Sequence, residues 1–292
     1  MTTFPAECVL RAGAVLAEGP VWDVARQRLW WVDIESRELH SYGPAARNDR
    51  AWTLLDRVGF AVPTARGDFI VGVGGGLARF GPEKRGVVTP VANVERKLRG
   101  NRFNDAKCDP AGRLWGGTMA LSEEPGHGSL YRVDAGWQIA RTVEGVSISN
   151  GLAWSPDGCT MYYIDSPTRR VDAFDFDLAS GDITNRRTVI EVTEGFPDGM
   201  CSDTAGNLWI ALWGGWGVVC FDPLTGGQLA KIEIPVEAVT SCCFGGPECD
   251  ELFITTASRD LDAAGRLQQP LAGSIFRARP EVGGEPPHLF AG

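Results

Sequence analysis

The chain has 292 residues, and its 43% hydrophobic and 22% charged residues are ordinary for a globular protein with a buried core. A formal net charge of −9 makes nucleic acids and anionic lipid surfaces unsuitable partners. No apolar run approaches the ~20 residues that a membrane-spanning helix needs, so we expect no membrane partner either.

Residues 2–7 lack both the basic start and the apolar core of a signal peptide, which favours a cytoplasmic protein. None of the eight cysteines forms a C-x-x-C pair, so we expect reduced, mostly buried thiols. Cys242 and Cys243 are adjacent and would face opposite sides of a strand, which makes them a poor chelate.

Six short apolar segments look like copies of one unit. Their first residues are 40, 45, 47, 47 and 44 positions apart. In chain order the segments begin at Leu29, Phe69, Leu114, Met161, Leu208 and Leu252. A period of roughly 40–50 residues, made of short strands and turns, is typical of propeller blades. We therefore predict an all-β, six-bladed β-propeller that forms a single domain over residues 1–292.

Each repeat consists of a small-residue segment, a turn rich in Asp, Pro and Gly, the apolar strand, and a further turn and strand. The sequence shows neither a long helical period nor a linker. To close the ring, residues 8–11 could complete the last blade beside residues 287–290, which would leave no exposed sheet edge inside the ring.

Counting back from the first turn of each repeat aligns equivalent residues of what we expect to be the innermost strand. Five residues before these turns stand, in chain order, Glu18, Ala61, Asn104, Asn150, Asp198 and Ser241. The same offset in each blade implies the same height in the ring, so these six stations should converge at one end of the central channel.

Four of the six stations carry carboxylate or amide oxygens, the ligands that Ca²⁺, Mg²⁺ and Mn²⁺ prefer. Without a cation, the two carboxylates would repel, and one would stay protonated. The alternative is that Asn-Gly and Asp-Gly pairs simply form turns, but four polar residues in one register favour a metal site. Ala61 and Ser241 would make the site lopsided and leave positions open for water and substrate.

At these residues the chain resembles the SMP-30/gluconolactonase/LRE family, which contains regucalcin and bacterial sugar lactonases. The matching motifs are residues 17–22, 101–105, 149–158 and 197–200. Residues 212–217 and 243–247 look like the bacterial aldonolactonase branch in particular.

The resemblance implies a six-bladed propeller with one divalent metal, and it leaves Ca, Mg, Mn, Zn and Fe(II) open. It implies Glu18, Asn150 and Asp198 as metal ligands, Arg102 as a donor to substrate hydroxyl groups, and Asn104 as a substrate contact or a neighbour of the metal. Some members carry an acidic pair directly after Gly-Thr-Met. Here that pair is displaced, which leaves Glu123 as a weaker candidate for a substrate contact.

The expected activity is hydrolysis of a sugar lactone, such as a glucono-, xylono-, arabinono- or galactonolactone, to the aldonic acid. Asp198 would act as the base; alternatively, a hydroxide on the metal would attack, and Asp198 would be a ligand only. Trp213 and Trp216 could form an apolar wall for the sugar or pack between blades. None of the three histidines lies in the station register, so a Ser-His-Asp hydrolase is not supported.

Two other functions compete with the enzyme. The first is a calcium-binding regulatory protein of the regucalcin type with little catalysis, and the second is a scaffold propeller that binds protein on its rim. Oxygen ligands in the channel count against the scaffold, and Arg102 with Asn104 favours the enzyme over the regulatory binder. We expect a monomer or a weak homo-oligomer.

Overall fold

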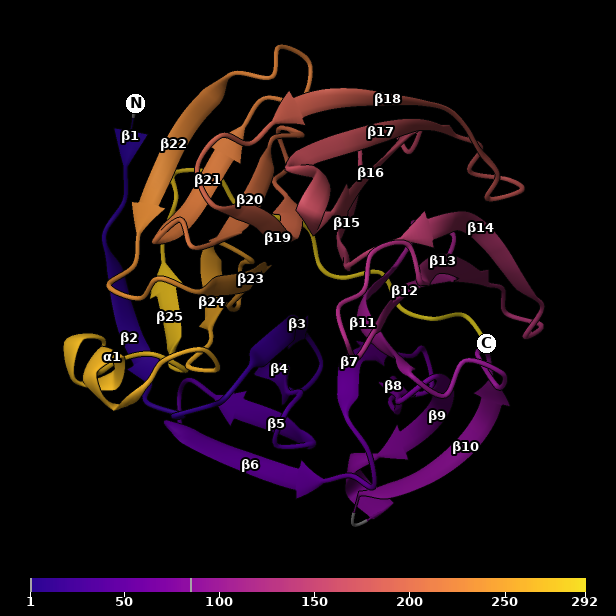
Figure 1. Ribbon diagram of the computed structural model, residues 1–292, viewed down its shortest axis with the longest axis horizontal. Coiled ribbons are helices and arrows are strands. Elements are labelled where there is room, and N and C mark those ends of the chain that lie inside the picture. The colour runs from indigo at the N-terminus through magenta and orange to yellow at the C-terminus, as the bar shows by residue number, and fades with distance from the viewer. Residues whose placement is uncertain (1, 85) are drawn as a thin grey trace.

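The computed structural model describes residues 2–84 and 86–292, and it shows six mainly antiparallel sheets arranged as blades around a common axis (Figure 1). The prediction of an all-β, six-bladed propeller is confirmed. In the described part of the chain the helices are short: α1 (Ala263–Gln268) and two 3-10 turns, Pro82–Lys84 and Ser166–Thr168. None of these helices is long and apolar enough to cross a membrane.

The small-residue segments form the innermost strands, as predicted. They are β3 (Ala17–Asp23), β7 (Val58–Pro63), β11 (Asn101–Cys108), β15 (Ser149–Trp154), β19 (Phe196–Ser202) and β23 (Val239–Gly245). The apolar segments form the second strands, which are β4 (Arg28–Asp33), β8 (Phe69–Val73), β12 (Leu114–Ala120), β16 (Thr160–Asp165), β20 (Leu208–Trp213) and β24 (Glu251–Thr256).

The third strands are β5 (Glu38–Gly43), β9 (Gly76–Gly81), β13 (Gly128–Val133), β17 (Arg170–Phe176), β21 (Gly217–Phe221) and β25 (Ile275–Ala278). The outermost strands are β6 (Asn48–Thr53), β10 (Val87–Asn93), β14 (Ile139–Val146), β18 (Ile183–Glu191), β22 (Gln228–Glu233) and β2 (Ala6–Leu10). The short strand β1 (Thr2–Thr3) runs parallel to β22 as a fifth strand of its sheet. Burial falls from the hub to the rim, because β7 is fully buried whereas β6 is mostly exposed.

The core lies between neighbouring blades. Apolar side chains of the β19–β22 sheet pack against those of the β23–β25 sheet in one continuous cluster. Two blades share a further contact, a hydrogen bond from the indole N–H of a tryptophan on the second strand to the aspartate carboxylate at the first turn. Asp109 accepts from Trp115 at 2.9 Å, and Asp203 accepts from Trp209 at 3.0 Å.

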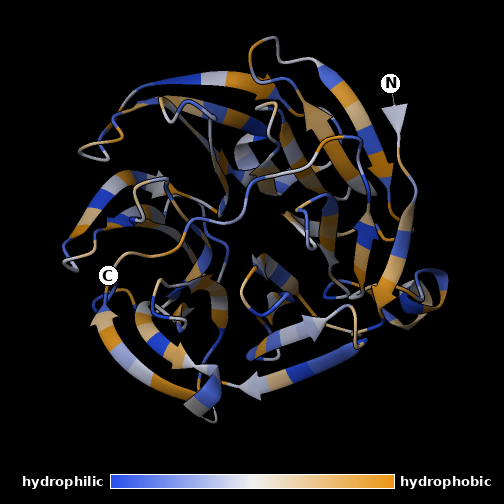
Figure 2. Ribbon diagram, turned by 180° about the vertical axis from the view of Figure 1, so that it is seen from behind, coloured by the Kyte–Doolittle hydropathy of each residue, from blue (hydrophilic) through white to orange (hydrophobic). Residues whose placement is uncertain are grey.

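The N-terminal strand closes the ring, but not with the partner that we expected. β2 does complete the last blade, where it pairs with β25. Residues 287–290 do not pair with β2, because β25 lies between β2 and β24 and takes the position expected for them. The C-terminal segment instead runs across one end of the ring (yellow in Figure 1, in front in Figure 2). There a β-bridge pairs Phe290 with Thr64, beside β7.

Every innermost strand changes register against its second strand close to the predicted stations. The shifts lie at Glu18/Val21, Val58/Phe60, Phe103/Ala106, Asn150/Leu152, Pro197/Met200 and Val239/Ser241. A bulge bends a strand and re-aims its side chains, so these irregularities turn selected residues toward the channel.

Close packing of the innermost strands explains the glycine that follows Asp198. A Cβ at position 199 would overlap Ser241 of β23. We therefore expect Gly199→Ala to lower the free energy of unfolding by about 2 kcal/mol, as overpacking does. Gly100→Ala is the matched control, since a Cβ there meets no atom within 4 Å. Urea unfolding of both variants checks this, and equal stability of the two would contradict the packing argument.

Candidate metal and substrate site

Four of the six stations lie together at one end of the channel. Glu18, Asn104, Asn150 and Asp198 line a cavity of about 260 Å³, which we call the site cavity. Arg102 and Glu123, the two other predicted site residues, line the same cavity. The structure therefore brings these six predicted site residues to one cavity.

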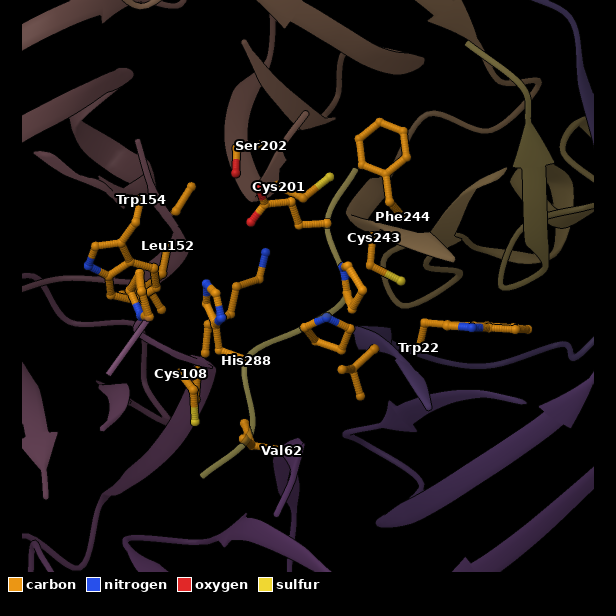
Figure 3. Close-up of a pocket in the computed structure, with 18 of the residues that line it drawn as sticks. Trp22, Val62, Cys108, Leu152, Trp154, Cys201, Ser202, Cys243, Phe244 and His288 are labelled. Atoms are coloured by element: carbon orange, nitrogen blue, oxygen red, sulfur yellow. The ribbon is translucent and has the colours of Figure 1, made fainter. Parts of the chain in front are cut away.

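The other two stations lie elsewhere. Ala61 and Ser241 line a second cavity of about 250 Å³ at the opposite end of the channel, the rear cavity (Figure 3). The assumption of equal height was wrong for these two, because their strands shift register at or before the station. The shift of β7 ends at Phe60, and that of β23 ends at Ser241. In the other four strands the station opens the shift or lies within it.

The two amides are held by hydrogen bonds that join neighbouring blades. Asn104 donates from Nδ2 to Asn150 Oδ1 at 2.8 Å and to the Ser149 carbonyl at 2.8 Å. Asn150 donates from Nδ2 to Ser166 Oγ at 2.8 Å, and Ser166 in turn donates to the Pro197 carbonyl. This orientation leaves one lone pair of Asn150 Oδ1 available, because an amide oxygen accepts two bonds.

The two carboxylates of the site are buried and incompletely paired. Glu18 Oε2 accepts from the Gly19 amide at 2.9 Å, whereas Asp198 Oδ1 has no hydrogen-bond partner in the part of the chain that the structure describes. Burial raises the pKa of Glu18 well above its ordinary value, and the charge of Asp198 adds to this. Burial, followed by the charge of Asp105, raises the pKa of Asp198 in the same direction.

This donor set fits a hard cation. A buried carboxylate oxygen without a partner is costly, and a cation would satisfy it and relieve the repulsion with Glu18. Among the described residues, no three His, Cys, Asp or Glu side chains are grouped to hold a metal ion. A cation here would therefore depend on the amide oxygen of Asn150 as well as on the two carboxylates.

Asp105 is a third buried carboxylate in the channel, and the sequence reasoning missed it. Burial raises its pKa, its Oδ2 has no partner among the described residues, and its charge acts on both Glu18 and Asp198. The signal was present, because glycine follows Glu18, Asn150 and Asp198, whereas Asp105 takes that place after Asn104.

Arg102 is 97% buried beside the amides. Its Nη1 donates to Asn104 Oδ1 at 2.5 Å and to the Phe103 carbonyl at 3.0 Å, and these bonds fix the guanidinium plane. Burial lowers the pKa of Arg102 to about 10, so the group stays charged at neutral pH. We find no hydrogen bond from Nε or Nη2 to any described residue, and these donors are therefore free for a ligand.

Comparison of the whole chain with known proteins decides its family. The model of the SMP-30/Gluconolactonase/LRE-like region matches residues 16–258. The chain belongs to this family. Regucalcin of Sus scrofa is 40% identical over 300 residues, and the match covers 100% of both chains.

Two further members of the SMP-30 family bear on function. YvrE of Bacillus subtilis, which bears the name "Putative sugar lactone lactonase", is 38% identical over 283 residues, which cover 96% of each chain. The crystal structure of regucalcin from Agrobacterium tumefaciens, described as a calcium-binding protein, has a TM-score of 0.94 at 30% identity and covers 99% of each chain.

The displaced acidic residue that the family resemblance left as a candidate lies at the mouth of the site cavity. Glu123 forms an ion pair with Arg259, from the loop after β24, and both residues line the cavity. Arg259 was not predicted, because it lies outside the repeated motifs and reaches Glu123 from another blade.

The apolar lining of the site cavity includes Trp213, Phe196 and Met119. Of the two tryptophans considered for this wall, Trp213 lines the cavity, whereas Trp216 is 44% exposed and is not among the lining residues. The three histidines all lie outside it. His288 lines the rear cavity, His127 pairs with Glu124 in a loop, and His40 pairs with Asp49.

Proposed function

We propose that this protein hydrolyses a sugar lactone to the corresponding aldonic acid with the help of one divalent cation. One observation carries the proposal: the unpartnered Oδ1 of Asp198 lies in a cavity that also holds Glu18, Asn150 and the free donors of Arg102. The similarity to YvrE, named as a sugar lactone lactonase, supports the same activity.

Glu18, Asn150 and Asp198 would hold the cation through carboxylate and amide oxygens. When bound there, the cation would polarise the lactone carbonyl as a Lewis acid. Hydrogen bonds from Asn104 and to Ser166 keep the amide of Asn150 in the orientation that leaves its oxygen available.

Asp198 would supply the base. The carboxylate oxygen of Asp198 that does not hold the cation would accept a proton from the water that attacks the lactone carbonyl, and it would return the proton to the ring oxygen as that oxygen leaves as a hydroxyl. Burial raises the pKa of Asp198 in the cation-free protein, whereas a bound cation would lower it, so Asp198 needs one oxygen that faces the water rather than the cation.

The remaining residues would orient the sugar. Arg102 presents Nε and Nη2 to hydroxyl or ring oxygens as a planar fork of donors. Trp213 and Phe196 would give the same cavity an apolar surface suited to the C–H face of a sugar ring. Positioning the bound lactone beside these groups would lower the barrier for an ester that is already reactive.

The test is a pH-indicator assay of aldonolactones that differ in one hydroxyl orientation or in one carbon, with Ca²⁺, Mg²⁺, Mn²⁺, Zn²⁺ or Fe(II) added and with a chelator. We expect opening above the uncatalysed rate with at least one lactone and one metal, and loss of that rate with chelator. Opening at background rate under every condition would contradict the enzyme. Calcium binding measured by calorimetry on the same sample would then favour the regulatory protein that the name regucalcin suggests.

Arg102→Lys tests the fork of donors. Lysine keeps the positive charge but loses the planar pair of N–H groups, so we expect kcat/KM to fall about 100-fold, mainly through KM. Arg57→Lys is the control, because Arg57 is a half-buried guanidinium paired with Glu35 near the same mouth. A fall of equal size in both variants would show that general charge, rather than the geometry of Arg102, governs binding.

A further inference from the structure

Two thiols face one another across the boundary between two blades. Cys201 lies on β19 and Cys242 lies on β23, the innermost strands of neighbouring sheets, and their sulfur atoms are 3.7 Å apart. We propose that Cys201 and Cys242 are an oxidative modification site, at which hydrogen peroxide converts the two thiols to a disulfide that joins these blades.

The geometry requires only a small movement. A disulfide bond is about 2.05 Å long, and sulfur atoms 3.7 Å apart are already in van der Waals contact. Cys242 Sγ also donates to the Trp209 carbonyl of β20 at 3.3 Å, so this side chain points at the blade that carries Cys201. The adjacent Cys243 packs in a different apolar cluster, on the opposite face of β23.

The rear cavity supplies a path for the oxidant. Cys201 lines this cavity of about 250 Å³, as the labelled side chains in Figure 3 show, whereas Cys242 is fully buried and is not among its lining residues. The C-terminal residues 285–288 lie along its edge. Hydrogen peroxide is close to water in size, so of the two facing thiols it reaches Cys201 before Cys242; Cys108 and Cys243 line the same cavity, but neither has another cysteine sulfur as a hydrogen-bond partner among the described residues.

The surroundings favour the same order. Burial opposes ionisation of Cys201, but its contact with the Cys242 thiol and the positive charge of Lys107 outweigh it and lower the pKa of Cys201. Lys107 extends from β11 across the channel and donates to the carbonyl of Met200, the residue before Cys201. Burial raises the pKa of Cys242, and so do the hydrogen bond and the charge of Cys201.

The reaction balances in two steps. The Cys201 thiolate attacks one oxygen of hydrogen peroxide, the O–O bond breaks, and the products are a sulfenic acid and, after protonation, water. This removes the charge of Cys201 that hindered ionisation of Cys242. The Cys242 thiolate then attacks the Cys201 sulfur, the S–OH bond breaks, and hydroxide leaves as a second water once protonated.

Peptide mapping of the native protein after treatment with hydrogen peroxide tests this. Trypsin cleaves after Arg187, Lys231 and Arg259, so a disulfide would join peptides 188–231 and 232–259. We expect a mass loss of about 2 Da that dithiothreitol reverses, with fragmentation placing the bond at Cys201 and Cys242. A bond to any other cysteine, or eight thiols still titratable after peroxide has oxidised free glutathione, would overturn the proposal.

Substitutions separate the two roles. Cys242→Ser should stop at the sulfenic acid, with a gain of about 16 Da that dimedone traps, and Cys201→Ser should form no bond. Cys243→Ser, the matched control, should link as the wild type does. Lys107→Met should slow the bond about tenfold without moving it. A disulfide in Cys201→Ser would contradict the role assigned to Cys201. If a serine variant fails to fold, the peptide map of the wild type still tests whether the disulfide forms.

Discussion

Replacing Asp198 with asparagine is expected to lower kcat for a sugar lactone by roughly 1000-fold. Asparagine keeps the size of the side chain but removes both the base and one of two negative charges for a cation, and general base catalysis alone contributes 10²–10⁴-fold. Because position 198 is buried, a water molecule would be a poor replacement for the missing carboxylate. Steady-state kinetics in the pH-indicator assay measures the change.

A control variant and a binding measurement separate the two roles of Asp198. Asp260→Asn makes the same chemical change at an exposed residue of the same cavity, and it should alter kcat less than about threefold. If Asp198→Asn loses turnover but keeps cation affinity by calorimetry, Asp198 acts chiefly as the base. Full activity in Asp198→Asn would remove Asp198 from the mechanism.

The blade repeat made most of the fold predictable from sequence. The second strands were recognisable because their apolar runs begin at a near-constant spacing, and burial of β4, β8 and β16 in the core follows from those runs. Glu18, Asn104, Asn150 and Asp198 could be grouped because equal offsets in a repeat imply equal positions in a ring. This grouping is valid only where the register shift falls at the same position in each innermost strand.

The residues that the sequence did not reveal depend on features outside the repeat. Ala61 and Ser241 were misplaced because the position of a bulge within a strand leaves no mark in an apolar pattern. Arg259 reaches Glu123 across the mouth from a loop 136 residues away, and such a pairing has no local signature. The course of the C-terminal segment depends on which strand pairs with β2 in the last blade, and tertiary packing decides that pairing.

Removal of the cation is expected to abolish turnover and to destabilise the fold more at pH 8 than at pH 6. In the cation-free protein, burial raises the pKa values of Glu18 and Asp198, so the folded state retains protons that the unfolded state has lost. Stability then falls as pH rises above the ordinary carboxyl range, because the folded state binds more protons than the unfolded state. A cation pairs with the ionised carboxylates and offsets this loss.

Calorimetric melting with chelator and with excess Ca²⁺ at the two pH values measures the effect. A cation at 100 times its Kd stabilises by about 2.7 kcal/mol, which corresponds to a rise in Tm of roughly 4–5 °C for a chain of this size. The double variant Glu18→Gln, Asp198→Asn removes both charges, so its Tm should respond neither to the cation nor to chelator. Its Tm in chelator at pH 8 should exceed that of the wild type, since no buried carboxylates repel. An undiminished response of the double variant would place the cation elsewhere, and the channel carboxylates would then need another explanation.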